Sequence, residues 1–264
     1  MKYVKFIDTD SHIRNGVLES DGAIKLLDGS ILDKYQVTDE SLTVKDIQEY
    51  LPPVVPPNII AIGRNYTEHA LELDSEVPER PLIFLKATSS LLAHGQSIRL
   101  PKPAPHEVDY EAELVVVIGK LAKCITAEQA PDYILGYTCG NDVTARDCQK
   151  RLDKQWARAK SFDTFAPVGP FIETELDPTN IRVRSILNGA TMQDDTTGNM
   201  IFPVFELISY LSQNFTLWPG TLIFTGTPSG VGAGRKPPVF LKPGDTIKIE
   251  VEGVGTLENT VELK

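Results

Sequence analysis

The chain has 264 residues, which at about 150 residues per domain predicts one large domain or a full domain with a small additional one. Hydrophobic residues make up 41% of it and charged residues 23%, so collagen-like, coiled-coil and disordered proteins are excluded. Asp and Glu outnumber Lys and Arg by 36 to 26. The resulting net charge of −10, without a basic patch, argues against binding to nucleic acid or to a membrane.

The first 56 residues are predicted to form a small α+β domain. They begin with a short apolar run, and a helix is predicted over residues 41–51 with Ser41 as its cap. The prolines within residues 52–57 then impose an extended segment that is incompatible with a helix. The domain boundary is therefore predicted at this segment, and residues 57–264 form the larger domain.

The larger domain is predicted to consist mainly of strands. Short apolar runs bounded by turn residues predict buried strands at residues 59–63, 81–86, 113–118, 136–140 and 222–225. Polar and apolar residues alternate over 181–187, and this run ends at Asn188-Gly189, a strong hairpin signal. Two further alternating strands follow Asp245.

Only two helices are predicted in this domain. Thr126 and Gln129 resemble a capping box ahead of residues 130–135, although Pro131 weakens that helix. The second helix is indicated by apolar residues on one face, namely Val204, Leu207, Ile208 and Leu211. The pattern as a whole predicts an α+β protein that is mainly β.

Two glutamates two residues apart introduce the most apolar of these strands. Because side chains alternate along a strand, Glu111 and Glu113 point to the same face. Two buried carboxylates at this separation repel each other unless a cation lies between them, and carboxylate oxygens suit a hard metal ion. Asp142, at the end of the next strand, is a candidate third ligand. The alternatives are a solvated strand edge for the glutamates and a turn or helix cap for Asp142.

Other polar residues offer candidate catalytic and binding groups. His69 and Glu72 are three residues apart and share a face if their segment is helical, so Glu72 is placed to orient the imidazole as a general base. An exposed acidic helix is the alternative. Arg146 and Gln149 carry donors suited to a carboxylate, with surface ion pairing as the alternative for them.

Four motifs, in order, resemble the fumarylacetoacetate hydrolase family, and the resemblance runs from about residue 57 to the C-terminus. They are DYEAELVVVIGK at residues 109–120, GYTCGNDVTARDCQ at 136–149, AKSFDTFAPVGP at 159–170 and PGTLIFTGTPSGVG at 219–232. The resemblance implies a mixed β-sheet roll with a small N-terminal domain. Motifs of metalloproteases, phosphate-binding loops and α/β-hydrolases are absent from the sequence.

The resemblance also implies a metal site and a catalytic pair. In this family the two glutamates and the aspartate, here Glu111, Glu113 and Asp142, bind one Mg²⁺ or Mn²⁺ per subunit. The pattern R-N-Y-x-x-H-x-x-E is intact here, and it implies that His69 and Glu72 lie on a segment that closes over the metal.

Four further residues receive roles from the resemblance. Arg146, Gln149 and Thr227 are implied to contact the carboxylate of the substrate, and Lys160 of the K-S-F motif is implied to face the reacting carbonyl. The assignment of Lys160 depends on the resemblance alone, because a lysine near an aspartate is otherwise an ordinary ion pair.

The activity expected from these roles is hydrolysis of a carbon–carbon bond in a 2,4-dioxo acid, such as an acylpyruvate or fumarylpyruvate, through a pyruvate enolate bound to the metal. Oxaloacetate decarboxylation and isomerisation of 2-hydroxyhepta-2,4-diene-1,7-dioate are the nearest alternatives, because they need the same or a related enolate. A metal-binding oligomeric scaffold without turnover is the alternative from another class, and the pairing of His69 with Glu72 argues against it.

The expected location is the cytoplasm and the expected assembly a homodimer. Cys124, Cys139 and Cys148 are odd in number and lack C-x-x-C spacing, which favours a reducing compartment. The N-terminus lacks the apolar core of a signal peptide, and no apolar run approaches the roughly 18 residues of a membrane span. The homodimer is implied by the family resemblance.

Overall fold

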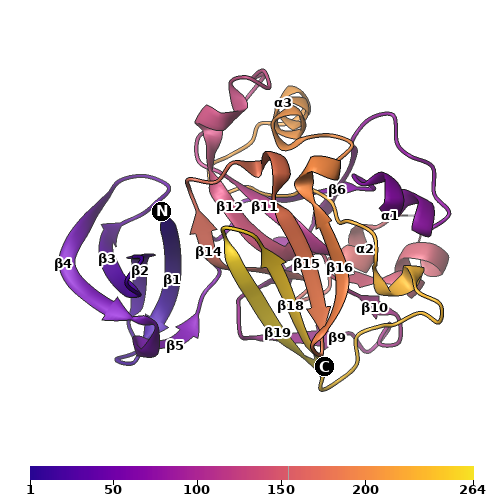
Figure 1. Cartoon of the computed structure of the whole chain (residues 1–264), viewed down its shortest axis with the longest axis horizontal. Coiled ribbons are helices and arrows are strands. Elements are labelled where there is room, and N and C mark those ends of the chain that lie inside the picture. Colours follow the sequence, from indigo (N-terminus) through magenta and orange to yellow (C-terminus); the bar gives the residue numbers. More distant parts are fainter. Residues whose placement is uncertain (154) are drawn as a thin grey trace.

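Two lobes of unequal size make up the molecule (Figure 1). The structure is a computed structural model that describes residues 1–153 and 155–264. The smaller lobe is built from β1 (Lys2–Asp8), β2 (Ile13–Leu18), β3 (Ala23–Gly29), β4 (Tyr35–Thr43) and β5 (Ile47–Tyr50). Consecutive strands from β1 to β4 pair antiparallel, and β5 returns to pair with β1.

The prediction of a helix over residues 41–51 is wrong. Thr43 and Asp46 cap each other in a reciprocal capping box, but they enclose only one 3-10 turn, Val44–Asp46. The backbone of the following residues, β5, pairs with β1 instead of continuing the helical turn. The half-buried side chains of Ile47 and Tyr50 pack on the small core of this lobe. The apolar spacing was compatible with a helix face, but backbone pairing between distant segments decided the structure.

The larger lobe continues the same sheet. Its order is β4-β3-β2-β1-β14-β12-β11-β17-β6-β7. The strands of the larger lobe are β6 (Ile59–Gly63), β7 (Leu82–Lys86), β11 (Ala112–Ile118), β12 (Ile134–Asn141), β14 (Ala166–Glu173) and β17 (Leu222–Phe224). Strands β6 and β17 are parallel, whereas β11 and β12 are antiparallel. A short strand, β8 (Leu91–Leu92), pairs parallel with β14.

A second sheet has the order β16-β15-β18-β19-β9. It contains β9 (Ser97–Leu100), β15 (Arg182–Leu187), β16 (Ala190–Thr196), β18 (Thr246–Val251) and β19 (Gly255–Leu263). The predicted hairpin between β15 and β16 is confirmed, with both Asn188 and Gly189 at positive φ. A separate pair joins β10 (Val108–Asp109) to β13 (Thr144–Ala145).

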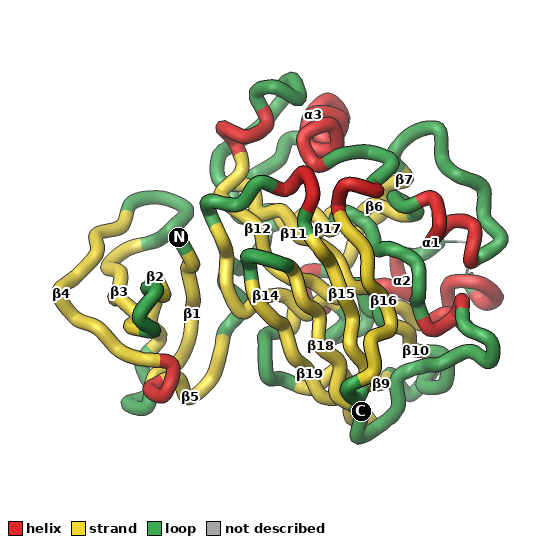
Figure 2. Tube along the Cα trace, in the orientation of Figure 1, coloured by secondary structure: helices red, strands yellow, loops and turns green. Residues whose placement is uncertain are grey.

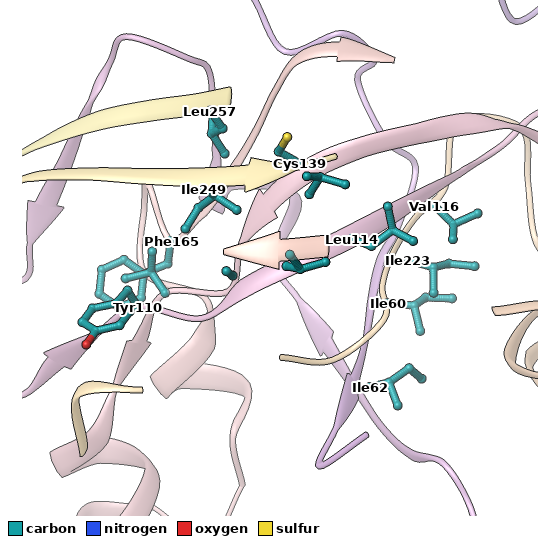
Figure 3. Close-up of a cluster of buried hydrophobic side chains, with 14 of the residues drawn as sticks. Ile60, Ile62, Tyr110, Leu114, Val116, Cys139, Phe165, Ile223, Ile249 and Leu257 are labelled. Carbon is teal, nitrogen blue, oxygen red and sulfur yellow. The ribbon is translucent and has the colours of Figure 1, made fainter. Parts of the chain in front are cut away.

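The main hydrophobic core lies where the two sheets meet (Figure 3). Leu114 of β11 and Cys139 of β12 are buried in one cluster with Ile249 of β18 and Leu257 of β19. The uncharged side chains of β11 therefore need apolar partners on both faces, which explains its nearly continuous apolar sequence. Glu113 on this strand, and Glu111 immediately before it, are thus carried on a backbone that is fixed from both sides.

Helical segments are few and short (Figure 2). The α-helices are α1 (Thr67–Glu72), α2 (Ala157–Lys160) and α3 (Val204–Asn214), and Cys148–Leu152 forms a π-helical turn. The 3-10 turns of the larger lobe are Thr88–Ser90, Ala130–Tyr133, Pro178–Asn180, Thr197–Asn199 and Gly232–Gly234. Helix α3 buries the predicted apolar face, whereas the helix expected at 130–135 is reduced to one turn containing Pro131.

The mainly β, α+β class is confirmed, with mixed parallel and antiparallel pairing in the large sheet. Within the described residues, the smaller lobe contains strands and one 3-10 turn rather than an α-helix. The described helices include none long and apolar enough to cross a membrane.

Candidate active site

Three carboxylates converge at the ends of two paired strands. Glu113 lies on β11 and Glu111 one residue before it, and Asp142 follows the last residue of β12. Antiparallel pairing of these strands places the three side chains together, and one oxygen of each lies within 4.8 Å of the others. The exposed fractions are 4% for Glu111 and 1% each for Glu113 and Asp142. The structure thus brings together the three residues predicted as metal ligands.

Two lysines contact this carboxylate cluster. The Nζ atom of Lys160, at the end of α2, lies 2.7 Å from Glu111 Oε2 and 2.6 Å from Asp142 Oδ2. Lys86, the last residue of β7, donates to Asp142 Oδ1 at 2.5 Å. Both ammonium groups are buried, so these contacts balance charges that water does not screen.

An arginine holds the opposite side of Glu111. Arg146 is 1% exposed, and its Nη2 atom lies 2.6 Å from Glu111 Oε1. Its Nε atom donates to Asp109 Oδ2 at 2.8 Å and its Nη1 atom to Gln149 Oε1 at 2.9 Å. Asp109 also accepts from the backbone N–H groups of Gly232 and Ala233, so the guanidinium is fixed by groups from three segments.

The carboxylates differ in their ionisation. Burial opposes the charge of Glu111, but the positive charges of Lys160 and Arg146 outweigh it and hold the pKa of Glu111 below its ordinary value. Burial raises the pKa of Glu113 well above its ordinary value, and the negative charges of Asp142 and Glu111 add to this increase. Among the described residues, the cations of the site pair with Glu111 and Asp142 rather than with Glu113.

The donor set fits a divalent metal ion. Four buried carboxylates, with Asp109 as the fourth, face three buried cations: Lys86, Arg146 and Lys160. With all four carboxylates ionised, one negative charge would be left over, and Glu113 would carry it because the cations pair with the other carboxylates. A divalent cation would relieve the repulsion that raises the pKa of Glu113. Its ligands from the protein would be carboxylate oxygens, the donors that hard cations prefer.

His69 and Glu72 face the cluster from α1. This segment is helical, which is the condition under which the two side chains share a face. His69 Nδ1 lies 2.8 Å from Glu72 Oε1, and the other oxygen of Glu72 accepts from the backbone N–H of Gly230 at 2.9 Å. Glu72 is thus held by a loop that is remote in sequence, and it fixes the ring of His69, which is 5% exposed.

Thr227 is placed near the cluster, but its hydroxyl is already engaged. It donates to the backbone oxygen of Ala112 at 2.9 Å and accepts from Gln193 Nε2 at 2.7 Å. Gln193 in turn accepts from the backbone N–H of Ala112. The side chain of Thr227 therefore ties the loop after β17 to β11, and its hydroxyl proton is not free for a substrate in this arrangement.

A single cavity of about 320 Å³ connects these groups. Its lining includes eight of the predicted site residues, namely His69, Glu111, Glu113, Asp142, Arg146, Gln149, Lys160 and Thr227. The ninth, Glu72, contacts His69. The cavity is also lined by apolar and basic residues, which include Phe84, Trp156, Arg64 and Lys150. It therefore offers an acidic, buried end and a wall suited to an apolar or anionic group.

Sequence reasoning missed Lys86 and Asp109. A signal for Lys86 was its position at the end of an apolar strand, since a lysine buried there needs a carboxylate partner. Asp109 lies in the strand before the E-x-E motif, and only the packing of Arg146 against it shows its role. The pairing of both residues depends on contacts between distant segments, as the separation of 56 residues between Lys86 and Asp142 illustrates.

The sequence of the larger lobe matches a known protein family. Residues 58–262 match the model for the C-terminal domain of fumarylacetoacetate (FAA) hydrolase, and the chain belongs to this family. Residues 1–53 match a second model, described as Rv2993c-like, N-terminal.

Named relatives include tautomerases and isomerases as well as a fumarylacetoacetate hydrolase. The mitochondrial oxaloacetate tautomerase Fahd2a of Rattus norvegicus is 45% identical over 80% of this chain and 69% of its own length. The structure of 5-carboxymethyl-2-hydroxymuconate delta-isomerase from Mycobacterium smegmatis is 38% identical, with a TM-score of 0.88 and all of both chains covered. That of 2-hydroxyhepta-2,4-diene-1,7-dioate isomerase from Mycobacterium marinum is also 38% identical, with a TM-score of 0.86 over 100% of this chain and 99% of its own. The chain therefore belongs to a family of enzymes that includes both activities.

Proposed function

We propose that this protein is a metal-dependent enzyme that transfers a proton on the carbon next to the carbonyl of a 2-oxo acid, as a tautomerase or isomerase. The main observation in support is that His69, oriented by Glu72, lines the same cavity as the buried cluster of three carboxylates. The printed activities of the relatives support this reaction class.

Glu111, Glu113 and Asp142 would hold the metal ion. When bound, a divalent cation polarises the carbonyl and carboxylate oxygens of a 2-oxo acid and so lowers the cost of forming an enolate. Lys160 and Arg146 keep Glu111 ionised and correctly oriented for this role. Both side chains also add positive charge at the end of the cavity where the negative charge of the enolate develops.

His69 is the proposed acid and base. Because a carboxylate only accepts hydrogen bonds, Nδ1 of the neutral ring carries the proton that faces Glu72, and Nε2 is left as the base. Nε2 takes a proton from the carbon next to the carbonyl, and the electron pair of the C–H bond moves into the enolate. Delivery of that proton to a different carbon completes an isomerisation, and its delivery to the enolate oxygen completes the keto-to-enol tautomerisation. In the reverse direction His69 removes the O–H proton of the enol and delivers it to carbon.

Hydrolysis of a 2,4-dioxo acid is a second candidate, and the same His69–Glu72 pair favours it. Here His69 would take a proton from water, which adds to the distal carbonyl. The carbon–carbon bond then breaks, its electron pair forms the enolate of the 2-oxo acid, and the enolate takes up the proton. Oxaloacetate decarboxylation would need the enolate but no water, so it uses the carboxylate cluster without this step.

Three assays distinguish these reactions. Loss of the enol absorbance of oxaloacetate reports tautomerisation, deuterium uptake at C3 of 2-oxobutyrate in D2O reports proton transfer, and pyruvate release from an acylpyruvate reports hydrolysis. We expect proton transfer to require Mg²⁺ or Mn²⁺ and to stop when EDTA is added. Its rate should fall at least about 100-fold in His69→Ala, whereas the exposed control His106→Ala should keep the wild-type rate. Pyruvate release without proton transfer would favour the hydrolase, and inactivity with retained metal binding would favour a scaffold.

We further propose one Mg²⁺ or Mn²⁺ per subunit, a homodimer and a cytoplasmic location. The oxygen-only ligand set supports the choice of a hard metal. Light scattering with metal analysis of the purified protein tests the first two points: a monomer, or a zinc-loaded protein, would contradict them.

A further inference from the structure

The loop of residues 226–235, named here the β17 loop, contacts the acidic residues of the site through its backbone. Its N–H groups donate to Glu113 Oε2 at 2.8 Å, to Glu72 Oε2 at 2.9 Å and to both oxygens of Asp109. Glu113 belongs to the carboxylate cluster, and Glu72 orients His69. One loop therefore joins the pair on α1 to the carboxylate cluster, so a residue that holds this loop also sets the position of Glu72.

Arg235 fastens the β17 loop to the second sheet. Its Nη2 atom donates to the backbone oxygen of Met192, in β16, at 2.5 Å. Its Nε atom donates to the backbone oxygen of Gly230 at 3.3 Å. Gly230 is the residue whose N–H group donates to Glu72. The half-buried guanidinium of Arg235 thus bridges a fixed strand and the one residue of the loop that contacts Glu72 by a hydrogen bond.

Two glycines let the backbone of the β17 loop approach its neighbours closely. Gly230 has a φ of 104°, in the left-handed region that suits glycine, and a Cβ there would lie 2.3 Å from the backbone oxygen of Met192. At Gly234 the three atoms nearest to a Cβ all belong to Glu72, and Oε2 would lie 2.5 Å away. The carboxylate of Glu72 therefore occupies a gap against the loop that has no room for a further methyl group.

We infer that Arg235 is a positioning residue for the reaction. It fixes Gly230, the N–H group of Gly230 fixes Glu72, and Glu72 keeps His69 in the tautomer that leaves Nε2 free as the base. The described residues that line the cavity do not include Arg235, so it acts through this chain of contacts rather than on a substrate. The inference rests on the proposed function for the role of His69 as the base.

The first test measures deuterium uptake by 2-oxobutyrate in the Mg²⁺-supplied protein. In Arg235→Gln kcat should fall about 3- to 10-fold with little change in KM, which is the effect of losing one hydrogen bond that orients the base. Arg235→Lys, which keeps a charged donor, should retain part of the rate. The control Arg182→Gln, which loses an exposed ion pair with Asp194 of β16, should keep the wild-type rate.

Gly234→Ala tests the same link without removing a functional group, and it carries the test if Arg235→Gln does not fold. The added methyl group should displace the carboxylate of Glu72 and lower kcat. Because both substitutions act through Glu72, neither should lower kcat further in a Glu72→Ala background, where the displaced atoms are missing. A wild-type kcat in Arg235→Gln and in Gly234→Ala overturns the inference. So does a loss of kcat that is undiminished in Glu72→Ala.

A spectroscopic measurement without substrate separates this inference from the proposed function. NMR spectra of protein with ¹⁵N-labelled histidine, recorded at about pH 8, well above the ordinary pKa of histidine, report the tautomer of each ring. The signal of His69, assigned by its loss in His69→Gln, should show the proton on Nδ1 in wild type. Arg235→Gln and Gly234→Ala should increase the share of the other tautomer, whereas an unchanged tautomer in both overturns the inference. The expected change in a protein whose wild type transfers no proton would count against the proposed function alone.

Discussion

Lys86 donates to one carboxylate oxygen of Asp142 while Lys160 donates to the other. Asp142 is therefore held in one orientation by residues from β7 and α2. We predict that Lys86→Met destabilises the metal-free protein by about 1–3 kcal/mol, because a buried carboxylate oxygen loses its donor. Saturating Mn²⁺ should raise the unfolding temperature more in this variant than in wild type, since the removed charge no longer competes with the metal.

Thermal unfolding with and without Mn²⁺ checks this prediction. Lys248→Met is the matched control, because Lys248 forms an exposed ion pair with Glu258 outside the site, and its stability should change little. An identical Mn²⁺ shift in wild type and Lys86→Met would show that Lys86 does not influence the metal site.

In the proposed function Glu72 acts by positioning His69, and this role can be separated from substrate binding. The two carboxylate oxygens of Glu72 accept hydrogen bonds from His69 and from the backbone N–H of Gly230. The amide of Glu72→Gln has only one oxygen and no charge, so it cannot make both hydrogen bonds with the same strength. We expect kcat for proton transfer to fall at least about tenfold with little change in KM. Glu68→Gln, on the exposed side of the same helix, is the control. A loss confined to KM would mean that Glu72 serves substrate binding instead.

Gly140 is required by the packing of the strand that precedes Asp142. A Cβ at this position would lie 2.3 Å from Cγ2 of Val115 and 2.7 Å from Cε1 of Phe224. We expect Gly140→Ala to lower the free energy of unfolding by about 1–3 kcal/mol, the usual cost of overpacking a core. In Gly95→Ala, where a Cβ meets nothing within 4 Å, only the left-handed backbone is strained. Urea unfolding of both variants measures the difference, and equal stabilities would contradict this account.

Asp8 makes the stability of the smaller lobe depend on pH. The hydrogen bond from Arg14, assisted by the backbone N–H of His12, holds the pKa of Asp8 below its ordinary value. A lowered folded-state pKa stabilises the protein above the unfolded-state pKa, about 3.9 for Asp, and this stabilisation is lost as the pH falls through the folded-state value. Asp8→Asn should therefore be less stable than wild type at pH 7, and the gap should narrow in acid. Urea midpoints across this range test it; a constant gap would refute the role of the charge.

Local patterns in the sequence predicted much of the larger lobe. Strand β6 was predicted with the bounds that the structure has, and the hairpin at Asn188-Gly189 follows from its turn residues alone. The two-residue spacing of Glu111 and Glu113 was enough to place both carboxylates on one face. These features depend on side-chain period and on backbone preferences within a few residues.

What the sequence did not reveal depends on contacts between distant segments. Residues 41–51 carry apolar spacing that suits a helix, but β1 offers this segment a strand partner. The partners of Lys86 and Arg146 become visible only when the strands are in register. Thr227 lines the cavity, and nothing in the sequence showed that its hydroxyl also fastens a loop to β11.

The pairing of β1 with β14 has a consequence for the solubility of the molecule. Residues 2–4 of β1 cover the backbone of β14 at Phe171–Glu173, and β14 is the immediate neighbour of the strand that leads to Asp142. The smaller lobe thus acts as a cover for a strand edge that would otherwise present unpaired N–H and C=O groups to other chains. A chain shortened to the larger lobe would expose that edge, and it would then be prone to self-association through β14.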